Sequence, residues 1–480
     1  MKESYTLILP AFLYGKLYKH LFPGDGDEHG AVICASICKT ENGFRLLARD
    51  LFLATDGVDY VPGIRGYKML HASFIQEKIL YCRENQLVYL AIHNHGGNNH
   101  VGFSSDDIAS HERGYPALLD INKGTPVGAL VFARNAVAGD IWLSYENRIE
   151  LTETRILGVS IKRLYPSPPM WMRNFNQFYD RQILLYGDVG HEILSKSKIG
   201  IIGLGGVGAL VNQLVARLGV GCIVAIDPER VSISNLPRVV GALRWHALSW
   251  LANSKVSWLK RLSEKLSMPK VDIAKNVAKS SNPDIRFKGI FGNALDSDVA
   301  KELVDCDFIF LTADSMQSRL LFNSLVYQYL IPGVQIGSKI THDKSSGELL
   351  DVFSVVRPVT PNGGCLFCNG LINNSQLQKE AISDYERKTQ AYVDDDDVTA
   401  PSVITLNAVG AGHAVDDFML KILGFTDESA STDYVKYFQR KRSVLYEEPR
   451  KDVGCRFCGT KETSIIAKGD LIRLPVKLTC

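Results

Sequence analysis

Two histidines separated by one residue are the first candidate for chemistry in this sequence. His93 and His95 directly follow the apolar run 87–92, which has the length of a strand. Residues i and i+2 of an extended chain face the same side, so both imidazoles can reach one metal ion. A catalytic zinc takes three protein ligands and keeps a fourth position for water. An aspartate shortly downstream, Asp106 or Asp107, can supply the third ligand.

A metal-bound water needs a general base, and a carboxylate stands in a suitable place for one. Glu28 precedes the strand-like run 30–37, and Asp27 is beside it. A simpler interpretation is a strand that ends in surface histidines next to the start of a helix. The upstream carboxylate, together with Ser104 and the aspartates after it, makes us prefer a hydrolytic zinc site. His100 is close in sequence, but we do not expect it to be a ligand.

The order of these residues over about 1–165 resembles the JAB/MPN metalloprotease family, whose members cleave ubiquitin-like proteins from lysines or trim their C-termini. The spacer before Ser-x-x-Asp is one residue longer here, and Gly96 stands where proline is usual. Counting residues selects Asp106, whereas the Ser-x-x-Asp spacing selects Asp107, which we prefer. The choice of base stays open between the two acidic residues. The resemblance implies zinc ligands His93, His95 and Asp107, the base Glu28, and Ser104 as a group that stabilises the oxyanion.

A glycine-rich turn is the second candidate site. Its glycines are Gly203, Gly205, Gly206 and Gly208. Such glycines allow a tight turn and a close approach of the backbone, and the start of the following helix attracts phosphate. Asp227 ends the next strand-like run, where a carboxylate can bind a ribose hydroxyl. The turn alone would suggest an NAD-dependent dehydrogenase.

Charged motifs around this turn favour nucleotidyl transfer instead. In chain order they are Tyr179-Asp-Arg181-Gln182, Ser234-Asn235-Leu-Pro-Arg238, Pro269-Lys270-Val and Thr312-Ala-Asp314, with Arg319 and Asn323 after them. Cations for a triphosphate and an aspartate for magnesium are what nucleotidyl transfer needs and hydride transfer does not. Over about 175–460 the set resembles the ThiF/MoeB/HesA family and the adenylation half of ubiquitin-activating enzymes.

This second resemblance implies ATP-dependent adenylation of the C-terminal glycine of a ubiquitin-like protein, with release of pyrophosphate. The implied assignments are phosphate contacts by Asn235, Arg238 and Lys270, ribose binding by Asp227, and magnesium binding by Asp314. Arg181 is implied to reach across a homodimer into the partner's site. The sequence has Glu229 where the family has a second aspartate, which leaves the role of Glu229 open.

Two Cys-x-x-Cys pairs form the third candidate site. They are Cys365-Leu-Phe-Cys368 and Cys455-Arg-Phe-Cys458. Four thiolates make a closed, structural zinc site; the alternatives are a redox pair or four free thiols. The ThiF-like family carries the same two pairs. Many activating enzymes also carry a reactive cysteine in the loop that matches 369–401, where this sequence has none, so Cys480 remains as a candidate thiol.

The elements that must position these residues predict an α/β protein of two domains. A mixed α/β, JAB/MPN-like domain is expected at 1–165, a proline-rich linker at 166–178, and an adenylyltransferase domain at 179–480 with a doubly wound, mostly parallel Rossmann-like sheet and a zinc-knuckle subdomain. In the first domain we expect strands at 30–37, 87–92, 127–133 and 140–145, and a helix from 104. In the second we expect strands at 198–203, 222–227, 308–312 and 333–337, and helices at 206–218 and 318–330. Residues 370–400 are expected to form a loop that ends in the run Asp394–Asp397.

Composition excludes several classes of protein. A net charge of +2 gives no basic footprint for nucleic acid. No apolar run reaches the roughly 20 residues of a membrane helix, and we see no signal peptide. Cysteines in pairs within a long chain of this kind favour metal over disulfides. We therefore expect a cytoplasmic protein without membrane or nucleic-acid partners.

These patterns together predict a bifunctional enzyme of a prokaryotic-type ubiquitin-like modifier pathway. Its cofactors would be ATP, Mg²⁺ and two zinc ions, one catalytic and one structural. Its partners would be a ubiquitin-like or sulfur-carrier-like protein that ends in glycine, and a conjugating enzyme or acceptor thiol. One alternative is a biosynthetic enzyme that adenylates a carrier protein or peptide for sulfur transfer, with the peptidase releasing the product. Another is a non-catalytic binding module.

Overall fold

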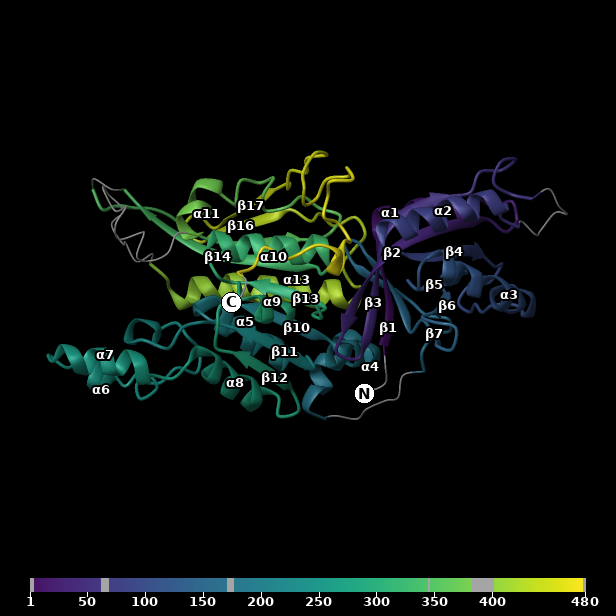
Figure 1. Ribbon diagram of the computed structural model, residues 1–480. Helices are drawn as coiled ribbons and strands as arrows, with labels where there is room; N and C mark the ends of the chain where they lie inside the picture. The colour runs from purple at the N-terminus through teal and green to yellow at the C-terminus, as the bar shows by residue number, and fades with distance from the viewer. Residues whose placement is uncertain (1–3, 62–68, 171–176, 344–345, 382–400, 478–480) are drawn as a thin grey trace. The chain divides into compact units, whose positions relative to one another are not determined.

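The computed structural model of the 480-residue chain describes residues 4–61, 69–170, 177–343, 346–381 and 401–477 (Figure 1). These form two compact units. Unit 1 comprises Met1–Met170, Gln328–Leu330 and Ile465–Arg473, and unit 2 comprises the remaining residues. Cys480, the run 394–397 and residues 171–176 of the predicted linker lie outside the described residues. No helix in the described ranges is long and apolar enough to cross a membrane.

Unit 1 is built on a mixed nine-stranded sheet in the order β7-β6-β5-β4-β2-β3-β1-β8-β9. Its strands are β1 (Ser4–Pro10), β2 (Gly30–Thr40), β3 (Gly43–Leu53), β4 (Val88–Asn94), β5 (Val127–Phe132), β6 (Val137–Trp142), β7 (Arg148–Glu150), β8 (Glu153–Leu157) and β9 (Ile161–Leu164). Its helices are α1 (Ala11–Leu21), α2 (Ala72–Asn85) and α3 (Ser105–Ile121), with the short η3 (Gly469–Leu471). The strand expected at 140–145 lies three residues earlier, as β6, because Leu143 and Ser144 donate their N–H groups to Asn147 in a turn.

The central strands of this sheet are buried on both faces, which explains their nearly continuous apolar sequences. Along β4, Leu90 and Ile92 join the core that contains residues of α1, whereas Tyr89 joins the core that contains residues of α2 and α3. Side chains alternate between faces, so the odd-numbered His93 falls on the same face as Tyr89. The sequence of β4 therefore directs its terminal histidine toward the face on which α3 packs.

Unit 2 has an eight-stranded sheet in the order β12-β11-β10-β13-β14-β15-β16-β17. Its strands are β10 (Lys198–Ile202), β11 (Cys222–Ile226), β12 (Arg286–Ile290), β13 (Phe308–Leu311), β14 (Gly333–His342), β15 (Leu349–Val359), β16 (Tyr434–Phe438) and β17 (Ser443–Glu447). The strands from β12 to β14 are parallel, and those from β14 to β17 are antiparallel. The predicted α/β class with a parallel-rich sheet is confirmed. The strand expected at 333–337 extends to His342 because β15 pairs along its whole length.

The helices of unit 2 are α4 (Asp180–Lys196), α5 (Gly206–Arg217), α6 (Ser249–Ala252), α7 (Ser257–Leu266), α8 (Lys270–Ser281), α9 (Ser297–Lys301), α10 (Met316–Gln328), α11 (Asn374–Ala381) and α13 (Ile404–Leu423), with the short η1 (Gln177–Tyr179) and η2 (Ile233–Asn235). Helix α5 packs against α8 and α13. The first strands and α5 form the βαβ unit that positions a phosphate-binding turn.

The prediction of a loop over 370–400 was wrong in its first part, where α11 forms. Asn373 accepts hydrogen bonds from the N–H groups of Ser375 and Gln376 and so caps the helix. Near its other end, the Glu380 carboxylate accepts hydrogen bonds from the N–H groups of Met316 and Gln317, 3.0 Å each. That tertiary contact at the start of α10 stabilises a polar segment that has no strong periodicity of its own.

Candidate metal and nucleotide sites

The two histidines and one aspartate of unit 1 form a group with the spacing of metal ligands. The Nε2 atoms of His93 and His95 are 3.1 Å apart. Asp107 places Oδ1 3.5 Å from His93 Nε2 and Oδ2 3.6 Å from His95 Nε2. Tetrahedral ligands at roughly 2.0–2.1 Å from one zinc ion lie about 3.3 Å from each other. The three side chains therefore fit one small cation with one coordination position left for water.

Helix α3 positions Asp107 through a capping box. Ser104 is the N-cap residue: its hydroxyl and its N–H donate to Asp107 Oδ2, and the Asp107 N–H donates back to Ser104 Oγ. Burial by itself would raise the pKa of the Asp107 carboxyl, but hydrogen bonds from His93 and Ser104 outweigh it and lower the pKa below its usual value. Asp106 is exposed and stands outside the ligand group, as does His100.

Glu28 is the carboxylate nearest to this group. Its Oε1 lies 3.8 Å from His95 Nε2, and its side chain is half-buried. The peptide groups on both sides of Glu28 are held by Asn94, which lies between the two histidines and is buried. Asn94 Oδ1 accepts a 2.6 Å hydrogen bond from the His29 N–H, and Asn94 Nδ2 donates to the Asp27 carbonyl at 3.4 Å. This residue, which the sequence interpretation missed, fixes the backbone that carries the candidate base.

A buried polar network supports α3 one turn beyond Asp107. His111 Nδ1 is 2.6 Å from Asp140 Oδ2, and Arg148 donates to the same carboxylate through Nε and Nη2. Burial opposes ionisation of Asp140, but the hydrogen bonds from His111 and Arg148 prevail and lower its pKa. The ring of Phe103 lies between those of His93 and His111, with centroids 6.1 and 5.0 Å away. A histidine in an apolar helix face and an aspartate in an apolar strand were the only signals of this network in the sequence.

The glycine-rich turn of unit 2 connects β10 to α5. Gly203 has φ +95°, and a Cβ there would lie 2.9 Å from the Ala313 nitrogen. A Cβ on Gly208 would lie 2.1 Å from the Gly203 carbonyl oxygen, so both positions require glycine. Gly205 is the N-cap of α5, and no side chain caps the helix. The first N–H groups of α5 can therefore bind a phosphate.

Asp227 lies at the end of β11 and is buried beneath this turn. Its two carboxylate oxygens accept hydrogen bonds from the Leu204 N–H at 2.6 Å and the Glu229 N–H at 2.8 Å. Burial raises the pKa of Asp227, and the nearby Lys270 ammonium and the two N–H groups only partly offset that effect. Lys270, which is also buried, forms an ion pair with the largely exposed Glu229 carboxylate. Asp227, Lys270 and the glycine turn thus lie together at the carboxyl ends of β10 and β11.

The remaining candidate nucleotide residues are placed as follows. Asn235 is buried in η2, and its side-chain oxygen accepts a hydrogen bond from the Ser232 N–H. Arg238 packs close to Gly206: a Cβ added to Gly206 would lie 3.4 Å from the Arg238 Cβ. Asp314 is exposed shortly after β13, and Arg181 is exposed in the first turn of α4. The reach of Arg181 into a partner's site stays a prediction. Asn407 of α13 was missed: it is buried, and its Nδ2 would lie 2.4 Å from a Cβ on Gly206.

The four paired cysteines form the second metal-like group. Cys365 and Cys455 have their sulfur atoms 3.7 Å apart, and Cys368 and Cys458 theirs 3.6 Å apart. Four sulfurs at 2.3 Å from one zinc ion would be about 3.8 Å from each other. A hydrogen bond from Cys365 is the main cause that lowers the pKa of the Cys458 thiol to about 5. The group could hold zinc.

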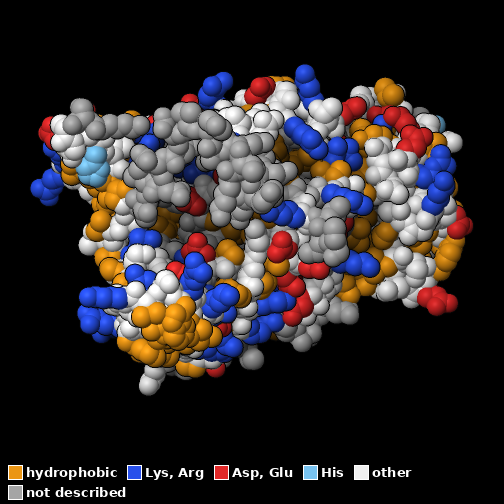
Figure 2. Space-filling view, turned by 60° about the vertical axis from the view of Figure 1, so that its left-hand side comes forward, with side chains coloured by type: hydrophobic (Ala, Val, Ile, Leu, Met, Phe, Trp, Pro, Cys, Tyr) orange, Lys and Arg blue, Asp and Glu red, His pale blue; other side chains and the backbone are white. Residues whose placement is uncertain are grey.

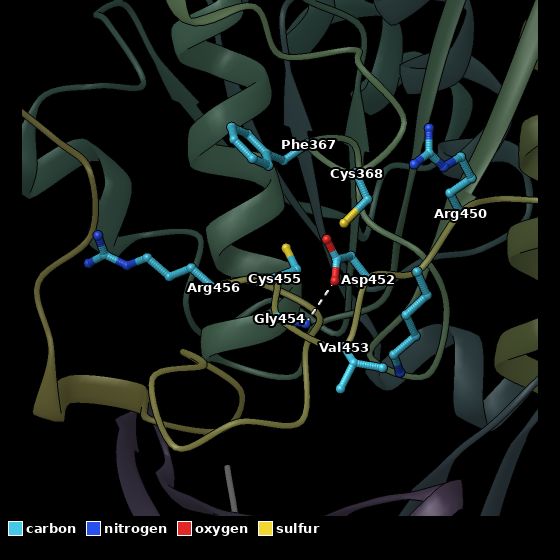
Figure 3. Close-up of a pocket in the computed structure, with 9 residues that line it drawn as sticks. Phe367, Cys368, Arg450, Asp452, Val453, Gly454, Cys455 and Arg456 are labelled. Carbon is cyan, nitrogen blue, oxygen red and sulfur yellow. Dashed lines mark hydrogen bonds between the residues drawn. The ribbon is translucent and has the colours of Figure 1, made fainter.

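Figure 3 shows the surface beside this group, where Cys368 and Cys455 point toward one another next to Asp452. The Asp452 carboxylate accepts the Gly454 N–H at 2.8 Å, which tightens the turn that carries the second cysteine pair. A hollow of about 710 Å³ lies here. Arg450 and Arg456 are part of its lining but point away from the sulfurs and from each other.

The parallel strands of the unit 2 sheet, with a glycine turn between β10 and α5, form a Rossmann-like nucleotide-binding arrangement. Residues 179–456, more than half of the chain, match the model of the ThiF family. The chain belongs to the ThiF family.

Several characterised proteins are similar to parts of this chain. The molybdopterin-synthase adenylyltransferase of Haemophilus influenzae is 32% identical over 143 residues, which are 29% of this chain and 51% of the relative. The SAMP-activating enzyme E1 of Haloferax volcanii is 24% identical, covering 40% and 60% of the two chains. The sulfur carrier protein ThiS adenylyltransferase of Bacillus subtilis is 23% identical, covering 59% and 72%. This chain spans about half the length of the first of these relatives.

Among solved structures, that of E. coli MccB with ATP is similar to part of this chain. The E. coli MccB structure with ATP has a TM-score of 0.42 and 18% identity, covering 61% of this chain and 76% of MccB.

Proposed function

We propose that this protein uses ATP to adenylate the C-terminal carboxylate of a small carrier protein of the sulfur-carrier or ubiquitin-like kind. The observation that carries the proposal is the glycine turn at the start of α5 with Asp227 beneath it and Lys270 beside it, in a member of the ThiF family. Two relatives named as adenylyltransferases of sulfur carrier proteins, from Bacillus subtilis and Thermus thermophilus, support the choice of carrier.

In the proposed reaction a carboxylate oxygen of the carrier attacks the α-phosphorus of ATP. A new C–O–P linkage forms, the bond to the β-phosphate breaks, and pyrophosphate leaves with the electron pair. The N–H groups of α5 and the side chains of Asn235, Arg238 and Lys270 would hold the phosphates, and Asp227 the ribose. Asp314 would hold Mg²⁺, which offsets phosphate charge. Arg181 would act in the partner's site of a homodimer.

The absence of cysteine from residues 369–401 bears on the fate of the adenylate. An enzyme that keeps the carrier as a thioester needs a thiol close to the adenylate, and this segment offers none. We therefore favour direct transfer of the carrier to an external thiol or amine. This favours a biosynthetic role in sulfur transfer over activation for a conjugating enzyme.

ATP–pyrophosphate exchange tests the adenylation proposal. We expect exchange that requires a carrier ending in glycine and that falls at least about 100-fold in Asp314→Ala. Asp298→Ala, an equally acidic and exposed position on α9, is the control and should leave exchange unchanged. Exchange that is carrier-independent, or that survives in Asp314→Ala, would contradict the proposal.

The ligand group of unit 1 supports a second function, zinc-dependent hydrolysis of a peptide or isopeptide bond at the carrier's C-terminus. His93, His95 and Asp107 would hold zinc, which activates a bound water. Glu28, 3.8 Å from His95, would take the proton of that water and deliver it to the leaving amine. Ser104 stays engaged with Asp107 in this geometry and would act on the oxyanion only after releasing that contact.

A pair of neighbouring substitutions tests this second function. Glu28→Gln should retain zinc but lower hydrolysis of a carrier with a C-terminal extension by about 10²–10⁴-fold. Asp27→Asn is the matched control, because it removes the adjacent carboxylate, and should change the rate by less than about threefold. Equal loss in both variants would remove the assignment of Glu28 as base.

A further inference from the structure

A short helical hairpin in unit 2 carries an unusual surface. Between Arg238 and Lys270 the chain forms α6 and α7, which project away from the sheet (Figure 1). Its exposed large apolar side chains are Leu243, Trp245, Trp250, Val256, Trp258 and Leu266. Trp250 is 71% exposed and Trp258 is 63% exposed. Three of the chain's 5 tryptophans therefore face solvent within one segment, which marks an interaction surface rather than scattered surface residues.

The charges around this surface have one sign. The segment 243–266 contains five exposed cations, Arg244, Lys255, Lys260, Arg261 and Lys265, and a single acidic residue, Glu264. No ion pair in the described residues neutralises these cations. The lower left of Figure 2 shows hydrophobic side chains gathered with lysines and arginines around them. A symmetric contact with a second copy would bring like charges together, so the surface favours a partner with an apolar centre and acidic surroundings.

The base of the hairpin is fastened to the nucleotide site. The Met268 N–H donates to the His246 carbonyl at 2.9 Å, and the Val231 N–H donates to the Met268 carbonyl at 2.9 Å. Pro269 has no N–H, and the N–H of the following residue, Lys270, donates to the carbonyl of Glu229 at 3.1 Å. The Glu229 side chain also pairs with the Lys270 ammonium. The segment 243–266 thus begins five residues after the candidate phosphate ligand Arg238 and ends four residues before the candidate phosphate ligand Lys270.

Chain length bounds the distance from this surface to the site. From Trp258 to Lys270 the chain takes eight steps along α7, to Leu266, and four more outside it, which together reach at most roughly 25 Å. An extended tail of seven or eight residues spans about the same distance. A folded carrier seated on the hairpin could therefore deliver its flexible C-terminus to the α-phosphate.

We propose that the α6–α7 hairpin is the docking surface for the protein whose C-terminus is adenylated, and that this protein presents an apolar patch surrounded by acidic side chains. This inference rests on the proposed adenylation. The hairpin supplies affinity for the folded body of the carrier, while the glycine turn and its cations act on the tail.

The test compares a whole carrier with its tail alone. The probes are an acidic ubiquitin-like carrier ending in Gly-Gly and a synthetic peptide of its last eight residues. In Trp250→Ala/Trp258→Ala the carrier concentration for half-maximal exchange should rise at least tenfold, with the maximal rate and the response to the peptide unchanged. Lys260→Glu/Arg261→Glu should act in the same direction. Tyr446→Ala, an equally exposed aromatic on β17, is the control and should match the wild type.

Binding of the fluorescently labelled carrier without ATP separates this inference from the proposed function. If the wild type binds the carrier and the tryptophan variant binds it at least tenfold more weakly, the docking surface is supported. If no exchange occurs in that case, only the adenylation proposal is contradicted. Equal binding by both, or no binding by the wild type, overturns the docking surface. Two other outcomes also overturn it, both with carrier binding intact in the variant. Loss of self-association would show that the surface binds a second copy, and loss of sedimentation with phosphatidylserine vesicles would show that it binds a lipid surface.

Discussion

The cluster of two histidines and one aspartate in unit 1 and the four-cysteine cluster in unit 2 both have the spacing of metal ligands, but their surroundings differ. The cysteine cluster offers four sulfurs, three of them on buried residues, and so fills a tetrahedral shell. The histidine cluster offers three ligands with side chains 20–25% exposed and a carboxylate 3.8 Å away. A filled shell suits a structural ion, whereas an open position beside a base suits activated water. The number of ligands and the nearest unligated group therefore distinguish a site suited to a structural ion from a site suited to a catalytic ion.

The largest effect is expected at the cysteine cluster. If the cluster holds the proposed zinc ion, Cys365→Ser should remove one zinc per chain and lower the free energy of unfolding of unit 2 by more than about 4 kcal/mol, because the ion would hold two distant turns together. Zinc analysis and denaturant unfolding measure both quantities. Cys306→Ser, at a buried cysteine outside the cluster, should keep the zinc. A Cys365→Ser protein as stable as this control would break the distinction between the two clusters.

A substitution in the histidine cluster should affect chemistry and leave the fold. His93→Ala is expected to lose the second zinc and abolish hydrolysis, while the free energy of unfolding changes by less than about 2 kcal/mol, since α3 and β4 are held by their own cores. Metal content and unfolding are measured together. His100→Ala should keep both zinc ions, and unfolding of unit 1 on loss of His93 would show a structural ion there.

A smaller effect is expected at Asn94, which holds the backbone on both sides of the candidate base Glu28. Asn94→Ala should lower hydrolysis about 10–100-fold with zinc content unchanged, the size typical of groups that orient metal-site residues. Asn94→Asp keeps the acceptor for the His29 N–H and loses the donor to Asp27, so it should recover part of the rate. An Asn94→Ala protein that loses zinc would instead make Asn94 a support of the ligands.

The smallest effect concerns acid stability and the network behind α3. The folded pKa of Asp140 is lower than its unfolded value, so its ionised form stabilises the fold. That contribution is fully present above the unfolded pKa of about 3.9 and is lost as pH falls through the folded value. In the wild type the free energy of unfolding should therefore fall as the pH drops below about 4, and Asp140→Asn should make this fall smaller. We expect a difference of about 1.5 kcal/mol, which is at the lower end of what hydrogen bonds to a charged group contribute. Acid titration of unfolding measures it. Asp106→Asn, at an exposed position on α3, should retain the wild-type slope.

The sequence predicted best where local spacing alone imposes a geometry. The glycines of the turn and the two cysteine pairs each depend on residues a few positions apart, so their positions could be recognised directly. Asn94 could not be found, because its partners are 65 and 67 residues away and asparagine commonly occurs on surfaces. The helix α11 was missed because a contact from Glu380 to the start of α10, across 64 residues, stabilises it.

The choice between neighbouring residues also depended on the fold. Counting residues selected Asp106, whereas the Ser-x-x-Asp spacing favoured Asp107, and the capping box at Ser104 is what places Asp107 beside the histidines. In the same way, Glu28 rather than Asp27 approaches His95, because Asn94 holds the backbone on both sides of it. The assignments of these residues to catalysis remain predictions.

Unit 1 takes in residues from the far end of the chain. Ser36 donates its hydroxyl hydrogen bond to the Ala467 carbonyl, and Gln328 Nε2 donates to the carbonyls of Gly469 and Ile472, all within unit 1. During translation these contacts must wait until the whole of unit 2 up to Ser464 has left the ribosome. A fragment that ends at Met170 would therefore expose the surface of β2 that η3 covers. Synthesis of the chain begins with unit 1, but unit 1 is completed only after most of unit 2 has been made.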